Sequence, residues 1–542
     1  MKNILLIGFM GTGKSTVGRM LARALNRRFV DTDTLVERIA GMAIPEIFSR
    51  MGEPAFRELE ARAVRTAAEL RDVVIAVGGG AVQNPQTREV VKKHCTVAFL
   101  AARPETILAR VENGERPMLS GYPQPEEKLA RVIDLLNQRT PAYLETADMT
   151  VDTEPGLDFV VSEIMSKLAQ ESPAQAPTAV KAAGVDTPSG RYSIRIGSGL
   201  IASPSRLIAE SCVDSRRVFV VSNPLVSELW LNDVETDLRD SGYTVETALI
   251  GDGEVHKSIQ SAHRLYDLLD ESGHDRSTVV LALGGGVVGD LAGFVAATFM
   301  RGLRFIQMPT TLLAQVDSSI GGKVAVNYRH HKNLIGAFHQ PKLVLSDIRT
   351  LWTLSDRVFS EGMAEVIKTA ILRGEGLFSF IERNAGEIAA RNLTVLQEVV
   401  TACAELKARL VSKDERDEGQ RMLLNLGHTF AHAFESACGC EGISHGQAVA
   451  VGICMATNIS SRIGLARPGL ADRISSLVHH FGLPTSISDL PTRPEPQQVL
   501  GHLNSDKKRY LGELRLVLPV DLGHVELVKG VPTGLIEETI PA

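Results

Sequence analysis

Two groups of residues in this 542-residue chain have the types and the spacing to do chemistry. The first is a glycine-rich segment at residues 8–15, with the sequence GFMGTGKS. It follows a short apolar run at residues 3–7 and precedes apolar residues at helical spacing from Val17 to Leu25. The glycines let backbone N–H groups turn toward nucleotide phosphates, Lys14 can reach the β- and γ-phosphates, and Ser15 can ligate Mg²⁺. This strand–loop–helix context predicts a nucleotide site rather than an accidental glycine-rich turn.

The second group combines three histidines and a glutamate. His428 and His432 lie four residues apart on one predicted helical face, His445 follows, and Glu365 offers a carboxylate. Two histidines and one carboxylate that leave a coordination position open are typical of a catalytic zinc site. Spacing alone would pair His428 with His432. Any one of these histidines could be a hydrogen-bonded helix residue, but together they predict a metal site.

The elements that must position these groups fall on either side of a compositional break. From Gln170 to Arg191 the chain is rich in Pro, Ala, Ser and Thr and shows no helical or strand period, which predicts a semi-extended linker. Pieces covering residues 1–170 and 188–542 are therefore expected to fold and work separately. The predicted domains are a P-loop domain at 1–169, a linker at 170–188, an α/β nucleotide-binding lobe at 189–345 and a helical lobe at 346–542.

The fold class predicted for the whole chain is α/β. The first domain should be a parallel sheet with helices on both faces. After the linker, strands at 191–197, 217–222 and 278–283 alternate with helical patterns and predict a Rossmann-like lobe. Helices predicted at 361–372, 393–411, 422–437 and 446–463 form an all-helical lobe, with the cleft between lobes as the default site. The glycine triplet at 284–286 is by itself a weak dinucleotide signal.

The composition is that of a globular protein without a nucleic-acid or membrane surface. The chain is 44% hydrophobic and 23% charged, with a formal net charge of −6. Six cysteines form no dense framework, which predicts a reducing cytoplasm. Cys438 and Cys440 lack the second pair that a four-ligand metal site needs. The sequence shows no signal-peptide run and no uncharged segment of membrane-spanning length.

Five further motifs follow the phosphate-binding loop: residues 29–33 (FVDTD), 52–60 (GEPAFRELE), 77–80 (VGGG), 116–119 (RPML) and 139–143 (RTPAY). With them, residues 1–168 resemble shikimate kinase. The resemblance implies that Asp33 grips the substrate hydroxyls and assists the attacking one, and that Asp31 lies near the Mg²⁺ held by Ser15. A gluconate- or adenylate-type kinase is the weaker alternative. The implied ATP contacts are Gly11, Gly13, Lys14, Ser15, Thr16 and the lid residue Arg116, and the implied shikimate contacts are Asp33, Arg57, Gly79 and Arg139.

The second half carries seven ordered motifs: residues 253–258 (GEVHKS), 284–290 (GGGVVGD), 301–302 (RG), 309–323 (PTTLLAQVDSSIGGK), 332–336 (KNLIG), 365–368 (EVIK) and 427–429 (GHT). From about Ser189 onward the chain resembles 3-dehydroquinate synthase. Ala431 and Gln447 stand where a Gly and a Glu are usual, and neither is an implied ligand. The resemblance implies Zn²⁺ or Co²⁺ on Glu365, His428 and His445, with His432 left as an acid or base.

The same resemblance implies the remaining site residues. The NAD⁺ contacts are Glu254, Lys257, Gly285, Gly286, Val287, Asp290, Thr310, Thr311, Asp317, Lys323 and Lys332. The sugar-phosphate contacts are Arg301, Lys323, Asn333, Lys368, Lys407, Arg421, Asn425, His432 and either Lys507 or its neighbour Lys508. Catalytic roles are implied for Lys14, Asp33, Arg116, Lys323, Lys368 and His432.

The expected protein is thus a cytoplasmic, bifunctional enzyme of aromatic-precursor biosynthesis. It would phosphorylate shikimate with Mg²⁺ and ATP, and convert a heptulosonate 7-phosphate to 3-dehydroquinate with a temporary oxidation by NAD⁺. A homodimer through the synthase part is expected. Two alternatives remain: a related cyclase or polyol dehydrogenase in the second half, or one half that has lost catalysis. Lys323, Lys332 and Arg421 argue against an uncharged polyol substrate.

Overall fold

The computed structural model describes residues 2–111, 124–168, 178–211, 215–329, 331–438, 442–509 and 514–540. The chain divides into two compact units, which are described separately below. No helix in these ranges is long and apolar enough to cross a membrane. The first unit contains Met1–Gln175, Pro224–Asn232 and Trp352–Asp356, and the second contains Ala176–Asn223, Asp233–Leu351 and Arg357–Ala542.

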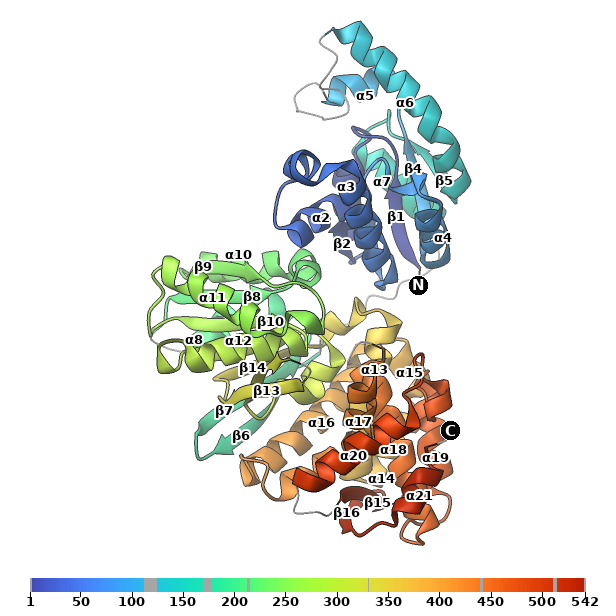
Figure 1. The fold of residues 1–542 in the computed structure, drawn as a ribbon. Coiled ribbons are helices and arrows are strands. Elements are labelled where there is room, and N and C mark those ends of the chain that lie inside the picture. The colour runs from blue at the N-terminus through green and yellow to red at the C-terminus, as the bar shows by residue number, and fades with distance from the viewer. Residues whose placement is uncertain are drawn as a thin grey trace. The chain divides into compact units, whose positions relative to one another are not determined.

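A five-stranded parallel sheet forms the centre of the first unit (Figure 1). Its strand order is β2-β3-β1-β4-β5, and all five residues of the central strand β1 are buried. The strands are β1 (Asn3–Ile7), β2 (Arg28–Asp31), β3 (Val73–Ala76), β4 (Cys95–Ala101) and β5 (Met149–Asp152). The helices are α1 (Lys14–Ala24), α2 (Thr32–Ala40), α3 (Ile44–Glu69), α4 (Pro85–His94), α5 (Pro104–Val111), α6 (Pro125–Thr146) and α7 (Leu157–Leu168), with α9 (Pro224–Val226) in the second segment.

The parallel register of this sheet sets the position of the site. β1 pairs with β3 on one side and with β4 on the other, and α1 and α7 cover one face through Val17, Leu21, Val160 and Ile164. Carboxyl ends of parallel strands meet at one edge of a sheet. The loops that follow β1, β2 and β3, which carry the predicted kinase motifs, therefore converge at that edge.

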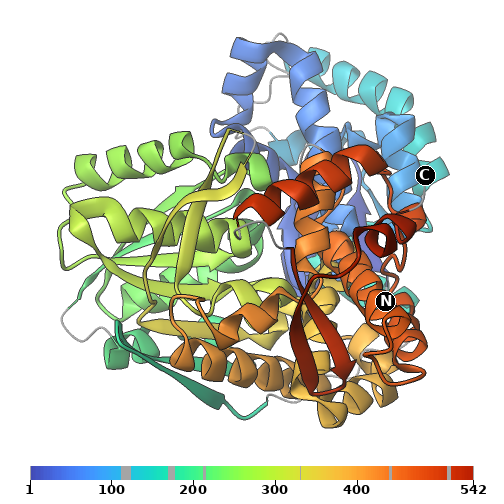
Figure 2. The same cartoon turned by 60° about the horizontal axis from the view of Figure 1, so that its bottom comes forward.

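The α/β part of the second unit is built on a seven-stranded sheet, drawn green to yellow in Figure 2. The order is β6-β7-β14-β11-β10-β8-β9, and all pairs are parallel except β6 with β7. The strands are β6 (Lys181–Thr187), β7 (Gly190–Gly197), β8 (Arg217–Ser222), β9 (Thr244–Leu249), β10 (Val279–Gly284), β11 (Arg304–Pro309) and β14 (Leu343–Asp347), with a separate antiparallel pair β12 (Lys323–Tyr328) and β13 (His331–Phe338). The helices are α8 (Ser205–Ser211), α10 (Asn232–Asp240), α11 (Ile259–Glu271) and α12 (Gly286–Thr298).

The end of the predicted linker is wrong. Residues 181–187 form β6, which pairs antiparallel with β7 through a two-residue turn between Thr187 and Gly190. An edge strand of this kind is held by backbone hydrogen bonds to one neighbour, and of its seven residues only Val185 and Thr187 are buried. Its composition therefore resembled a linker although its backbone belongs to the sheet.

The remainder of the second unit is mainly helical, as predicted, with one additional hairpin of β15 (Arg515–Asp521) and β16 (His524–Lys529). The expected helix at 422–437 is interrupted, because Gly427 adopts φ 81° and starts a new helix. His428 is thus the first residue of that helix. The helices are α13 (Asp356–Arg373), α14 (Glu375–Arg383), α15 (Ala385–Ala389), α16 (Leu393–Lys413), α17 (His428–Ala437), α18 (His445–Arg462), α19 (Leu470–His480), α20 (Pro496–Arg509) and α21 (Thr533–Glu538).

Candidate active sites

The phosphate-binding loop lies between β1 and α1, where Gly13 adopts φ 88° and caps the helix. Lys14 Nζ donates hydrogen bonds to the carbonyls of Gly8 (3.0 Å) and Phe9 (2.9 Å), so its ammonium lies over the loop. Ser15 Oγ donates to Asp31 Oδ2 at 2.6 Å. The loop can therefore present a cation to a phosphate and a hydroxyl–carboxylate pair to Mg²⁺.

Asp33 is the ionisable group beside this loop. It lies in the first turn of α2, where its backbone N–H donates to the capping residue Asp31. Burial and the neighbouring Asp31 raise the pKa of Asp33 to about 6, against a smaller opposing effect of Lys14. A carboxyl with a pKa near 6 can take up and release a proton close to neutral pH.

The turn after β3 brings the remaining predicted acceptor residues together. A methyl group on Gly78 would lie 2.6 Å from Glu60 Oε1 and 2.8 Å from Asp33 Oδ1. One on Gly80 would lie 2.5 Å from Arg57 Nη1. Between them, the Gly79 carbonyl accepts a hydrogen bond from Arg139 Nη1 at 3.4 Å. The two arginines thus flank one short, side-chain-free turn, as a clamp for a carboxylate would require.

Sequence reasoning missed Glu60, which is 4% exposed and accepts from Arg57 Nη1 at 2.8 Å. Its position in the same motif as Arg57, three residues later on α3, could have indicated the pair. Gly11 lies in the loop, and Thr16 lies exposed in the first turn of α1. Arg116, the predicted lid residue, lies outside the described residues.

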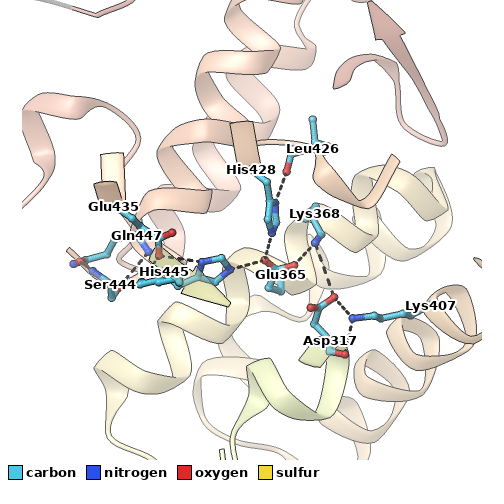
Figure 3. Close-up of polar contacts among 11 residues, drawn as sticks. Asp317, Glu365, Lys368, Lys407, Leu426, His428, Glu435, Ser444, His445 and Gln447 are labelled. Atoms are coloured by element: carbon cyan, nitrogen blue, oxygen red, sulfur yellow. Dashed lines mark hydrogen bonds and ion pairs between the residues drawn. The ribbon is translucent and has the colours of Figure 1, made fainter. Parts of the chain in front are cut away.

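In the second unit, the three predicted metal ligands come together from three helices (Figure 3). One ligand atom from each of Glu365 on α13, His428 on α17 and His445 on α18 lies within 4.8 Å of the others. Nε2 of each histidine is 3.5 Å from Glu365 Oε1. Glu365 is 1% exposed and the His445 side chain 36%, so the cluster is closed at the carboxylate and open at His445. The donor set fits a catalytic zinc or cobalt ion.

The charge environment of this cluster keeps the ligands in different states. Burial and Lys368 lower the pKa of His428 to about 3, which leaves it neutral. Burial opposes the ionisation of Glu365, but Lys368 and the two histidines hold its pKa well below the ordinary value. Burial also disfavours charge on His445, yet Glu365 and Glu435 raise the pKa of that imidazole to about 10.

Glu435 is a second residue that the sequence analysis missed. Its Oε1 lies 3.3 Å from His445 Nδ1 and accepts from Lys332 Nζ at 2.8 Å. It lies seven residues after His428, two turns along the same face of α17, which is the signal that could have found it. His432 is exposed, and its ring centroid is 5.7 Å from that of His428.

Glycines allow the ligand-bearing helices to approach closely. A methyl group on Gly446, next to His445, would overlap the backbone of Glu361 in α13. One on Gly452 would overlap the Gly427 carbonyl just before His428. The spacing of the metal ligands is therefore set by backbone packed directly on backbone.

Two buried lysines border the metal cluster. Lys368 is 1% exposed and forms ion pairs with Glu365 and, at 4.0 Å, with Asp317. Lys407 pairs with Asp317 Oδ1 at 2.7 Å and donates to its carbonyl at 2.6 Å. Burial lowers the pKa of Lys407 to about 8, against the effect of Asp317. Asp317, predicted as an NAD⁺ contact, thus holds two cations in this structure.

The glycine triplet and Thr310–Thr311 among the predicted NAD⁺ residues follow the carboxyl ends of the central strands β10 and β11. Gly285 caps α12 directly after β10, so Gly286 and Val287 lie in the first turn. Lys257 is 5% exposed, and its ammonium donates hydrogen bonds to the Asp290 carboxylate and to Asn333 Oδ1. Glu254 accepts from Asn327 at 2.8 Å, and Thr311 Oγ1 accepts from the Ala314 N–H.

Two observations fit a dinucleotide here. Thr310 Oγ1 is buried and has no hydrogen-bond partner among the described residues. After β8 the chain continues to β9 on one side, whereas after β10 it continues to β11 on the other side. The carboxyl ends of the neighbouring strands β8 and β10 therefore form a topological switch point.

The other predicted substrate residues lie on several different elements of the second unit. Lys323 pairs with Asp417, which the sequence analysis missed, and Arg421 is 3% exposed. Asn425 ends a short helical segment just before Gly427. Lys507 lies in α20, and its side chain is outside the described part. Arg301 is exposed beyond the end of α12, about 20 Å along that helix from Gly286 at its start.

Comparison with known proteins supports the family predicted for each half of the chain. Residues 10–169 match the shikimate kinase family model, and residues 247–361 and 362–509 match the N-terminal and C-terminal models of 3-dehydroquinate synthase. The 3-dehydroquinate synthase of Desulforamulus reducens is 43% identical over 347 residues, which cover 64% of this chain and 96% of the relative.

Two solved structures share the fold of the second half. The 2-epi-5-epi-valiolone synthase of Streptomyces hygroscopicus, with NAD⁺ and Zn²⁺ bound, is 24% identical with a TM-score of 0.59 over 68% of this chain and 98% of that one. A 2-deoxy-scyllo-inosose synthase with carbaglucose-6-phosphate, NAD⁺ and Co²⁺ is 25% identical, with a TM-score of 0.58 over 66% of this chain and 99% of that one. The chain belongs to the 3-dehydroquinate synthase family through its C-terminal part, and it carries a shikimate kinase domain before it.

Proposed function

We propose that the residues described above carry out the two reactions of this bifunctional shikimate-pathway enzyme. The first is ATP-dependent 3-phosphorylation of shikimate. The second converts 3-deoxy-D-arabino-heptulosonate 7-phosphate to 3-dehydroquinate and phosphate. The observation that carries the assignment is the convergence of Glu365, His428 and His445 beside two buried lysines. A polyanionic substrate would find both a metal and fixed cations there.

In the kinase, the acceptor is held and deprotonated by separate groups. Arg57 and Arg139 bind the shikimate carboxylate, while Asp33 orients the attacking hydroxyl and takes its proton. Lys14 neutralises charge on the transferring phosphoryl group, and Ser15 with Asp31 holds Mg²⁺. Gly11, Gly13 and Thr16 line the ATP phosphates, and Arg116 is proposed to close over them.

In the synthase, the residues that line the predicted metal and NAD⁺ sites fit these two cofactors. Glu365, His428 and His445 would hold Zn²⁺ or Co²⁺, and Lys257, Gly285, Gly286, Asp290 and Thr310 would bind NAD⁺ with their neighbours. When bound, the metal acidifies a substrate hydroxyl, and NAD⁺ takes up and later returns a hydride.

The residues of the chain then fix the substrate and move protons. Lys368, Lys407 and Arg421 hold its anionic groups, and Asn425 and Asn333 its hydroxyls. With a pKa of about 8, Lys407 can hold or release a proton near neutral pH, and His432 faces the site as an exposed acid or base. Lys323 is released from Asp417 to meet the substrate.

A related sugar-phosphate cyclase is the alternative, because the two solved structures above are synthases of other products, 2-epi-5-epi-valiolone and 2-deoxy-scyllo-inosose. The 43% identity with a 3-dehydroquinate synthase favours the dehydroquinate reaction. A polyol dehydrogenase is disfavoured by the buried cations Lys368, Lys407 and Arg421, which an uncharged substrate does not need.

A homodimer through the synthase part and a cytoplasmic location are also proposed. The β12–β13 pair exposes Tyr328, Leu334 and Phe338, with Leu334 54% exposed, and association would cover such side chains. Analytical ultracentrifugation of the full chain and of Leu334→Asp tests this proposal; a monomeric wild type would contradict it.

A crossed pair of substitutions tests the two activities. Lys14→Met removes the charge that meets the transferring phosphate, and His428→Ala removes a metal ligand. Each should lower one reaction by orders of magnitude and leave the other near normal. Steady-state assays of both variants on both substrates measure this. If neither substrate is converted by the wild-type protein, the function itself is refuted; if Lys14→Met also slows the synthase, the two sites are coupled.

A further inference from the structure

The β6–β7 hairpin, residues 181–197, lies at the end of the segment that joins the two enzymes. It is the edge of the α/β sheet, but it also packs along α16 of the helical part. The Asp186 N–H donates to Ser412 Oγ at 3.0 Å, and Gln397 Nε2 donates to the Ile196 carbonyl at 3.1 Å. One hairpin is therefore bonded to both parts of the synthase.

Arg421 is held between these two parts by backbone carbonyls. Its Nη1 donates to the Glu415 carbonyl at 2.8 Å, and its Nη2 donates to the Gly321 carbonyl at 3.2 Å. Gly321 has φ 103° and belongs to the loop before β12, whereas Glu415 belongs to the loop after α16. A side chain at Gly321 would overlap the Arg421 guanidinium, so this approach needs glycine.

One of these two carbonyl residues is anchored directly by the hairpin. The Tyr192 hydroxyl on β7, a 6% exposed residue, accepts a hydrogen bond from the Gly321 N–H at 3.0 Å. The other, Glu415, accepts from Gln340 Nε2 at 2.8 Å through its carboxylate. A hydrogen-bond path thus runs from Tyr192 in the hairpin through Gly321 to the buried guanidinium of Arg421.

We propose that the β6–β7 hairpin positions Arg421 for the anionic sugar-acid phosphate, with Tyr192 as the positioning residue. The inference rests on the proposed substrate role of Arg421. Tyr192 does not touch the substrate; it restrains Gly321, whose carbonyl orients one nitrogen of the guanidinium. A guanidinium that donates two hydrogen bonds to one anionic group binds that group less tightly when its orientation is not fixed. The affinity for the substrate therefore depends on this hairpin.

Tyr192→Phe in the full-length chain removes one hydroxyl and keeps the ring. Loss of one such hydrogen bond should raise KM for the heptulosonate phosphate about 3- to 10-fold. The kcat of the synthase, NAD⁺ affinity, metal content and kinase activity should stay within about twofold. The matched control is Tyr266→Phe, which loses a hydroxyl that is hydrogen-bonded to Thr298 between α11 and α12.

A double-mutant cycle with Arg421→Lys separates positioning from a general structural effect. In the Arg421→Lys background, Tyr192→Phe should change KM by less than twofold, because the oriented fork is already gone. An equal effect of Tyr192→Phe in both backgrounds, or an effect no larger than that of Tyr266→Phe, would overturn the inference. An unchanged KM in Arg421→Lys alone would refute the substrate role of Arg421, and with it the inference. Absence of synthase activity in the wild-type chain would refute the proposed function instead.

Discussion

Asp33 carries the clearest consequence of a single side chain's environment. Its pKa is raised to about 6 by burial and Asp31, and only the carboxylate can accept a proton. The kcat/KM of the kinase should therefore fall about tenfold per pH unit below about pH 6. A pH–rate profile on shikimate measures this, and Asp33→Glu should shift its acid limb. A profile that stays flat to pH 5 would remove Asp33 from the proposed role.

The raised pKa of Asp33 can also be tested by a stability measurement, which does not depend on kinase activity. Because the folded-state pKa lies above the ordinary value of 3.8, stability is lost as pH rises from about 4 through about 6. At pH 8 the buried carboxylate is charged at a cost on the order of 3 kcal/mol. Asp33→Asn should raise the Tm of the kinase domain at pH 8 and have little effect at pH 4.

Glu435 should control how tightly the synthase holds its metal. It restrains His445 through Nδ1, and loss of such a partner typically lowers metal affinity 10- to 100-fold. Glu435→Gln keeps the shape and removes the charge, so competition with a chelator should show weaker binding of Zn²⁺ and Co²⁺. Glu405→Gln, a partner of Arg373 on the same helical part, is the control. Equal affinities in the two variants would show that His445 needs no such restraint.

At the scale of the elements, the contact between α18 and α13 has no space for a side chain. Gly446→Ala should force α18 away from Glu361 and draw His445 from Glu365. Overpacking of this kind costs about 1–3 kcal/mol, and synthase activity should fall with metal content. Urea unfolding and metal analysis measure both effects.

Gly376→Ala is the matched control for this change. Gly376 lies in α14, and a methyl group there meets nothing within 4 Å. The variant should be neutral or slightly stabilising, since alanine is the better helix former. Destabilisation of both variants to the same extent would show that the close helix contact is not the cause.

Elements with a strong apolar signal were predictable from the sequence. β1 and β8 occupy the expected residues because fully buried strands are continuous apolar runs. β6 was missed because hydrogen bonds to a single neighbour, rather than buried side chains, hold it in place. The break at Gly427 was missed because apolar spacing continues across it, although a glycine can adopt the left-handed conformation found there.

The site residues also divide into those that the sequence predicted and those that depend on tertiary structure. Its motif residues could be named, but spacing favoured His432 over His445 as the second ligand until the family resemblance was used. Only the crossing of α17 and α18 brings His445 to Glu365. Glu435 and Asp417 act through residues distant in the sequence, Lys332 and Lys323, so their pairing depends on tertiary structure.

At the scale of the whole molecule, β6 moves the useful boundary between the two enzymes. Separate pieces covering 1–170 and 176–542 should each keep most of their activity, because both sheets remain complete. A piece beginning at residue 190 loses β6, the strand that pairs with β7 and Tyr192, so its synthase KM should rise and its Tm should fall. Assays and thermal melts of the three pieces test this. A piece from 190 that matches the longer one would show that the edge strand is dispensable.

The glycine contacts that bring α18 against α13 and against the turn before α17 also determine when the metal site comes into existence. His428 and His445 lie on consecutive helices, but Glu365 lies on the much earlier helix α13, and the three ligands meet only when backbone rests on backbone. Metal binding is therefore coupled to the packing of these helices, and removal of the ion should lower the stability of the helical part.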